Sequence, residues 1–96
     1  EKFDALIKSD SPVLVDFFAE CVDREVYVAV LEEVKADIGE KARIIKIDVD
    51  KFGELADKYR IQSVPTFILF KNGESLWRHS GVIQAKELKE IIKQHI

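Results

Sequence analysis

The chain has 96 residues, of which 47% are hydrophobic and 34% are charged, so it can form one modest core and one domain spanning residues 1–96. Its net charge of −3 argues against nucleic acid or an anionic membrane as the main partner, because such binding needs a basic surface. No apolar run reaches the roughly 18 residues of a membrane span, and the one cysteine cannot form an internal disulfide, so we expect a cytoplasmic protein.

Helical and strand patterns alternate along the chain. The predicted elements are a helix within 1–10, a buried strand over 12–18, a helix that ends at Gly39, a buried strand over 43–50, a short helix over 51–60, a hairpin over 66–81 and an amphipathic helix over 84–96. The hairpin turns at Asn72-Gly73, the strongest short turn signal. Strands that alternate with helices favour a parallel pair, to which the hairpin adds antiparallel strands. We therefore expect an α/β domain with a small mixed sheet of about four strands and helices on both faces.

The segment 19–34 combines two conflicting signals. It is rich in β-branched valines, which favour a strand. Apolar residues nevertheless recur every four positions, at Val22, Val26, Val30, Val34 and Ile38. With Asp23 as the N-cap and Gly39 after the last turn, this period predicts a helix, at a cost of a few tenths of a kcal/mol per valine.

Several motifs, in this order, resemble those of the thioredoxin family. "PVLVDFFAE" resembles the strand that leads into the family's active site, and "KIDVD" resembles the next strand. "SVPTFILFKNGE" resembles the segment with the cis-proline and the hairpin, and "HSGVIQAKELKEII" resembles the last strand and helix. The resemblance implies a thioredoxin fold. The family's first strand would precede Glu1, so we expect a truncated chain or a trimmed fold.

The family's W-C-G-P-C motif corresponds here to "ECVDREVYVAVLEE", which is one residue shorter and holds one cysteine. Cys21 aligns with either the tryptophan or the first cysteine, and Arg24 falls nearest to the resolving cysteine. The family's dithiol reaction needs both thiols. The leading interpretation is a redox-inactive thioredoxin scaffold, either engineered or degenerate, in which Cys21 is vestigial. The alternative is a monothiol oxidoreductase that forms mixed disulfides through Cys21 and is resolved by an external thiol.

Asp16 and Lys46 are the single charges inside the two buried strands. By resemblance, Asp16 is the buried carboxylate that accepts a proton from the resolving cysteine, and Lys46 is its charged partner. Because that cysteine is absent, we expect a buried structural pair with no catalytic task.

Pro65 marks the expected substrate-binding edge. By resemblance, the bond between Val64 and Pro65 is cis, and the backbone beside it pairs with extended substrate peptides. The resemblance also places Thr66 and Gly81 at this edge. We therefore expect an extended peptide or protein as the partner, provided that the facing loop over residues 20–23 keeps its shape.

Few other residues suggest a ligand. His79 and His95 have no acidic or cysteine partners at ligand spacing, so we expect neither a metal nor a cofactor. Trp77 is predicted to pack against side chains of a neighbouring strand. Phe52 is predicted either to cover the shortened loop or to pack under it. We expect a monomer, with a domain-swapped dimer as the alternative, because a shortened hinge favours swapping.

Overall fold

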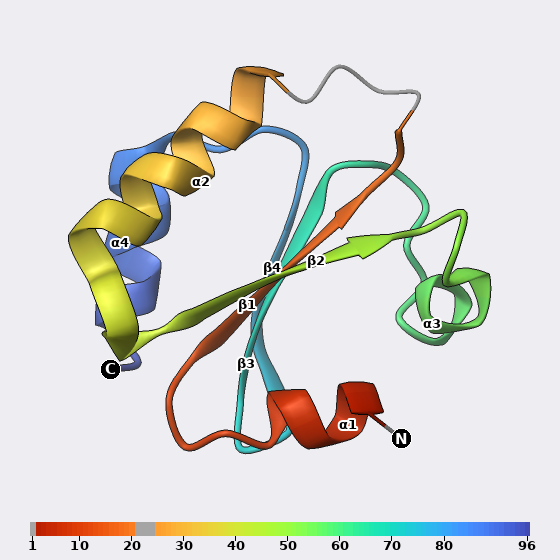
Figure 1. Cartoon of the computed structure of the whole chain (residues 1–96), viewed down its shortest axis with the longest axis horizontal. Coiled ribbons are helices and arrows are strands. Elements are labelled where there is room, and N and C mark those ends of the chain that lie inside the picture. The colour runs from red at the N-terminus through yellow and green to blue at the C-terminus, as the bar shows by residue number, and fades with distance from the viewer. Residues whose placement is uncertain (1, 21–24) are drawn as a thin grey trace.

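The computed structural model describes residues 2–20 and 25–96 of the chain (Figure 1). Its elements are α1 (Lys2–Ile7), β1 (Val13–Phe18), α2 (Glu25–Ile38), the short 3-10 helix η1 (Gly39–Lys41), β2 (Arg43–Asp48), α3 (Gly53–Lys58), β3 (Thr66–Lys71), β4 (Glu74–Ser80) and α4 (Ala85–Lys93). The predicted order of helices and strands is confirmed. Within the described ranges, no helix has the length and apolar character needed to cross a membrane.

The strands form one four-stranded sheet in the order β2-β1-β3-β4. β1 and β2 are parallel, whereas β3 is antiparallel to both β1 and β4. Figure 1 shows α2 and α4 against one face of the sheet and α1 and α3 against the other, with β2 nearest to the viewer. The small mixed sheet predicted from the sequence is confirmed.

The two faces of the sheet carry separate cores. The α2/α4 core consists of Leu14, Phe18, Leu31, Val34, Ile38, Phe67, Leu69, Ile83, Leu88 and Ile92. The α1/α3 core consists of Phe3, Ile7, Val13, Val15, Phe17, Ile47, Ile68 and Phe70. All residues of β1 are buried, because successive side chains enter the two cores alternately. This double burial explains why β1 appears in the sequence as a nearly continuous apolar run.

Gly39 and the Asn72-Gly73 turn end their elements as the sequence predicted. Gly39 follows α2 with a φ of +64°, in the left-handed region where glycine avoids the penalty of a side chain. Asn72 and Gly73 both have positive φ, the signature of a type I′ hairpin turn. The helical period of the valine-rich segment is confirmed over α2, whereas the predicted cap at Asp23 lies outside the described residues.

A set of aromatic rings joins α3 to the sheet. The Tyr59 ring lies 5.7 Å from that of Phe3 and 5.4 Å from that of Phe70, between centroids. Arg78 on β4 donates hydrogen bonds to the backbone carbonyls of Tyr59 and Arg60, the latter at 2.8 Å. These carbonyls follow the last turn of α3, so Arg78 fixes the C-terminal end of this helix on the sheet.

Surface ion pairs connect α2 with α4. Lys93 Nζ lies 3.1 Å from Asp37 Oδ2, and Lys89 Nζ lies 3.2 Å from Glu33 Oε2 and 3.9 Å from Asp37 Oδ2. The hydrogen bond and the charge of Lys93 lower the pKa of Asp37 below its ordinary value of 3.8, with smaller contributions from other lysines. Asp37 therefore stabilises the folded state only when its carboxylate is ionised.

We expect the Asp37→Asn variant to lose less stability than the parent chain as the pH falls below about 4. The folded-state pKa of Asp37 is lowered, so its contribution is present above the unfolded pKa and disappears as the pH falls through the folded pKa. Urea denaturation from pH 6 to pH 2 measures this difference. Parallel curves for the two proteins would contradict it.

Candidate functional site

The predicted substrate-binding edge is built around the loop that enters β3. The bond between Val64 and Pro65 is cis, as the sequence predicted. The Pro65 carbonyl accepts a hydrogen bond from the Gly81 N–H at 2.8 Å. The Thr66 hydroxyl donates to the Ser63 carbonyl at 2.7 Å and lies 3.3 Å from the Ser80 hydroxyl. These contacts bring Pro65, Thr66 and Gly81 together and fix the loop against the end of β4.

This loop lies beside the end of β1. The register pairs Thr66 with Phe17, so Pro65 is level with the last residue of β1. From there the chain continues through Ala19 and Glu20 to Cys21. Residues 21–24 lie outside the described residues, and the roles predicted for Cys21, Asp23 and Arg24 therefore stay predictions.

Apolar side chains flank the exposed backbone of the loop. Val64 is half-buried, and Val82, which directly follows Gly81, is 51% exposed. Within the described part of the chain, no hydrogen bond uses the Val64 backbone N–H or C=O. These two groups can pair with an extended peptide whose side chains contact Val82. The sequence interpretation missed Val82; its signal was an apolar residue between Gly81 and the polar start of α4.

Asp16 lies in the centre of the sheet, on the face covered by α2 and α4, and has 0% exposure. The register pairs it with Lys46 on one side and with Phe67 on the other. The predicted burial is confirmed for Asp16 and is wrong for Lys46, whose side chain is exposed, and the pairing of the two charges stays a prediction. Lys46 reaches solvent because β2 is an edge strand.

The remaining predicted residues take structural positions. Trp77 is paired with Leu69 and packs against the α2/α4 core, as predicted, and its ring is stacked on His79 at 5.9 Å. The His95 carbonyl accepts a hydrogen bond from Lys71 Nζ at 2.7 Å. Among the described residues, no group of three or more His, Cys, Asp or Glu side chains could hold a metal ion. Phe52 is 52% exposed and lines a hollow between α1 and α3.

A four-stranded mixed sheet, helices on both faces and a cis-proline loop beside the end of β1 define a thioredoxin fold. Comparison with known proteins extends this conclusion from the fold to the family. The thioredoxin family model matches residues 1–94, and the chain belongs to the thioredoxin family.

Relatives include chloroplastic thioredoxin Y1 of Arabidopsis thaliana, with 42% identity over 94 residues, and a thioredoxin of Rickettsia bellii, with 39% identity over 94 residues. The chain is covered to 97% in both alignments and spans 55% of the Arabidopsis protein and 90% of the Rickettsia protein. Among solved structures, oxidised mitochondrial thioredoxin 3 of Saccharomyces cerevisiae has a TM-score of 0.86 at 26% identity, covering 97% of this chain and 87% of the yeast chain.

Proposed function

We propose that this chain is a redox-inactive thioredoxin scaffold that binds extended peptides at the Pro65 edge. The observation that carries the first half is the single cysteine of the chain. The departures from the family's sequence pattern are concentrated around Cys21, and the rest of the fold is retained. This concentration supports an engineered or degenerate active site.

The chemistry of disulfide reduction explains why one cysteine is not enough. A thiolate attacks one sulfur of the substrate disulfide, and the other sulfur leaves as a thiolate. A second thiol of the same protein then attacks the mixed disulfide, releases the reduced substrate and closes a new disulfide. Two electrons leave the protein as its two thiols become one disulfide. Cys21 alone can form the mixed disulfide but cannot resolve it.

The peptide-binding half of the proposal rests on the geometry of the edge. The hydrogen bond between Gly81 and Pro65 holds the loop in place, so binding requires little ordering of its backbone. The unused backbone groups of Val64 offer main-chain hydrogen bonds, and Val82 offers an apolar contact. This surface does not need a second cysteine.

With dithiothreitol as electron donor, we expect the parent chain to reduce insulin no faster than its Cys21→Ser variant. Arg24→Cys restores two cysteines at C-x-x-C spacing and is expected to raise the rate by roughly tenfold or more, because the second thiol can resolve the mixed disulfide. Arg24→Ser is the matched control and should stay at background. Insulin turbidity measures all four proteins. A parent rate clearly above that of Cys21→Ser would contradict the proposed inactivity.

Alkylation of Cys21 against pH separates this proposal from the monothiol alternative. An inert thiol should react slowly, with a midpoint at or above the free-thiol pKa of about 8.5. A midpoint well below that value, together with glutathione-dependent turnover of a mixed disulfide, would instead establish a monothiol oxidoreductase.

A further inference from the structure

The loop over residues 60–65 connects α3 with β3 and carries the Val64 backbone at the candidate peptide-binding edge. Figure 1 shows this loop running from α3 to the end of the sheet at which β1 ends. Gln62 and Ser63, in the middle of the loop, are exposed. An exposed loop keeps one conformation only where other groups hold it, so the contacts at its two ends determine how Val64 is presented.

β4 holds this loop at both ends. At the end next to β3, the Gly81 N–H donates to the Pro65 carbonyl at 2.8 Å. At the end next to α3, Arg78 donates through Nη1 to the Tyr59 carbonyl and through Nη2 to the Arg60 carbonyl, the latter at 2.8 Å. One strand therefore supplies the contacts that fix both the start and the end of the loop.

The position of Arg78 in the sheet allows this contact. The register pairs Arg78 with Ile68, which belongs to the α1/α3 core. Residues directly opposite each other in antiparallel strands point to the same face, so the Arg78 side chain lies on the face that α3 covers. Three residues further along, the same strand leads into Gly81.

The chemistry of the contact suits a guanidinium. Carbonyls at the C-terminal end of a helix lack partners within the helix, and a planar guanidinium can donate to two neighbouring carbonyls at once. Arg60 has a φ of +55°, in the left-handed region that residues with a side chain rarely adopt. At this residue the chain turns from α3 into the loop. The charge-assisted hydrogen bond from Arg78 to the Arg60 carbonyl therefore stabilises an otherwise unfavourable backbone conformation.

We propose that Arg78 is a positioning residue of the peptide site: it holds the start of the loop so that the Val64 backbone keeps the conformation that pairs with an extended peptide. This inference rests on the proposed binding of peptides at the Pro65 edge. A loop that is fixed in advance loses less conformational entropy on binding, so removal of the fixing contact lowers the affinity. By linkage, a bound peptide in turn favours the loop conformation that Arg78 holds.

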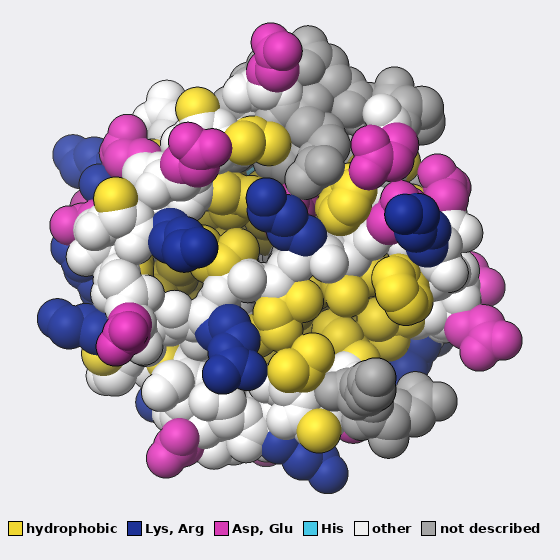
Figure 2. Space-filling model, in the orientation of Figure 1, with side chains coloured by type: hydrophobic (Ala, Val, Ile, Leu, Met, Phe, Trp, Pro, Cys, Tyr) yellow, Lys and Arg dark blue, Asp and Glu magenta, His cyan; other side chains and the backbone are white. Residues whose placement is uncertain are grey.

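The test titrates an uncharged peptide of eight residues, in which serine alternates with valine and both ends are blocked, and follows amide chemical shifts. Figure 2 shows basic and acidic side chains intermixed on the molecular surface, and an uncharged peptide keeps changes of charge out of the comparison. Arg78→Met removes both donors, and we expect it to bind at least about fivefold more weakly than the parent chain. Arg78→Lys keeps the charge but lacks the fork that spans two carbonyls, so its affinity should lie between the two.

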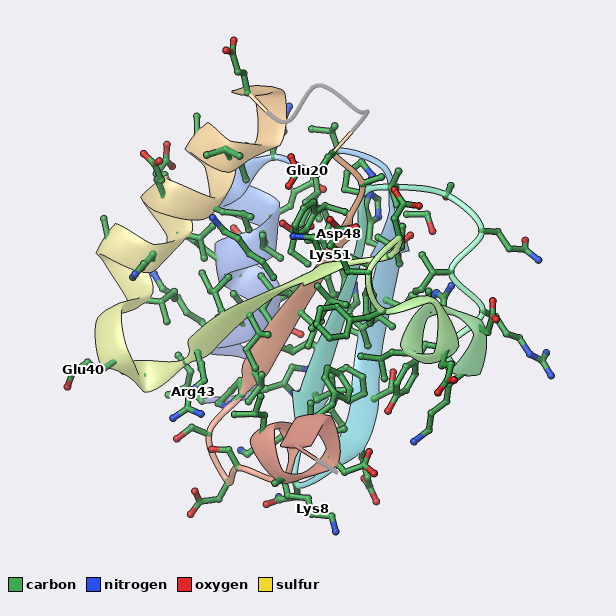
Figure 3. All side chains as sticks on the ribbon, turned by 45° about the vertical axis from the view of Figure 1, so that its right-hand side comes forward. Lys8, Glu20, Glu40, Arg43, Asp48 and Lys51 are labelled. Carbon is green, nitrogen blue, oxygen red and sulfur yellow. The ribbon has the colours of Figure 1, made fainter. Side chains whose placement is uncertain are left out.

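Lys71→Met is the matched control. Lys71 Nζ also donates to a distant backbone carbonyl, that of His95 at 2.7 Å, so this variant loses a comparable contact. Lys71 directly precedes the hairpin turn, which lies against Lys8, whereas Glu20 follows β1 at the Pro65 end of the sheet. Figure 3 shows Lys8 and Glu20 at opposite ends of the sheet. Lys71→Met should therefore bind the peptide as the parent does.

Amide hydrogen exchange separates positioning from a general loss of stability. The Ile61 N–H, directly after Arg60, donates to the Ala56 carbonyl at 2.9 Å. In Arg78→Met, exchange should rise more at Ile61 than at Leu88 in α4. Saturating peptide should slow exchange at Ile61 in the parent chain, and less so in Arg78→Met, because Arg78 links this end of the loop to the bound conformation.

Three results would overturn the positioning role and leave peptide binding at Pro65 in place: equal affinity of Arg78→Met and the parent chain, equal weakening by Arg78→Met and Lys71→Met, or a bound peptide that leaves exchange at Ile61 unchanged. If the parent chain binds no peptide, or if the shift changes lie away from Val64 and Val82, the proposed peptide binding fails and the positioning role fails with it.

Discussion

Asp16→Asn is expected to increase the free energy of unfolding at pH 7 by about 1–3 kcal/mol. The Asp16 side chain has 0% exposure and lies between β2 and β3 among the apolar residues of the sheet. Burying a charged carboxylate costs solvation energy that a neutral amide does not lose. Asparagine has nearly the same shape and removes the charge. Urea denaturation of the two proteins measures the difference.

Asp48 provides a matched control in the same sheet. It is also buried, with 6% exposure, but its Oδ1 accepts hydrogen bonds from the backbone N–H groups of Asp50 at 2.9 Å and Lys51 at 3.4 Å. Asp48→Asn weakens these charge-assisted bonds and should cost about 0.5–1.5 kcal/mol. Opposite signs for the two aspartates are the expected result. A clear loss of stability in Asp16→Asn would show that its carboxylate supports the fold.

The order of elements could be predicted because each buried strand and each helix has a strong local pattern. β1 lies between two cores, so its residues are apolar on both faces, and this produced the run that marked it as a strand. The turn at Asn72-Gly73 and the end of α2 at Gly39 were predictable because positive φ restricts the residue type. The cis bond at Pro65 was predicted by resemblance to the thioredoxin family.

The errors and omissions concern positions that depend on sheet order or on distant contacts. Lys46 has the same local setting in the sequence as Asp16, a single charge in an apolar strand. It is exposed because β2 is at the edge, and strand order is not contained in the pattern of one strand. Arg78 was missed because its acceptors are 18 and 19 residues away in the chain. Val82 was missed because its exposure depends on where β4 ends, and the sequence pattern alone does not define that end.

Phe17→Ala should lower the free energy of unfolding by about 3–5 kcal/mol, a large part of the roughly 5–15 kcal/mol typical of a small domain. Phe17 has 0% exposure, belongs to the α1/α3 core and lies 6.2 Å from the Tyr59 ring between centroids. Removing its ring leaves a cavity that the surrounding strands cannot fill. The same change at Phe52, which is 52% exposed, should cost less than about 1 kcal/mol. Similar losses at the two positions would contradict this view of the core.

The position of Phe17 also connects the core with the candidate site. Its register partner is Thr66, and the next residue along the chain from Phe17 is level with Pro65. Phe17→Leu, a milder change that should keep the domain folded, is therefore expected to increase hydrogen exchange at the Gly81 amide, which bonds to the Pro65 carbonyl. Amides in α4 are the internal reference. If exchange rises equally at both places, the variant loosens the whole domain; a rise confined to Gly81 would show that packing at the end of β1 holds the peptide-binding edge in place.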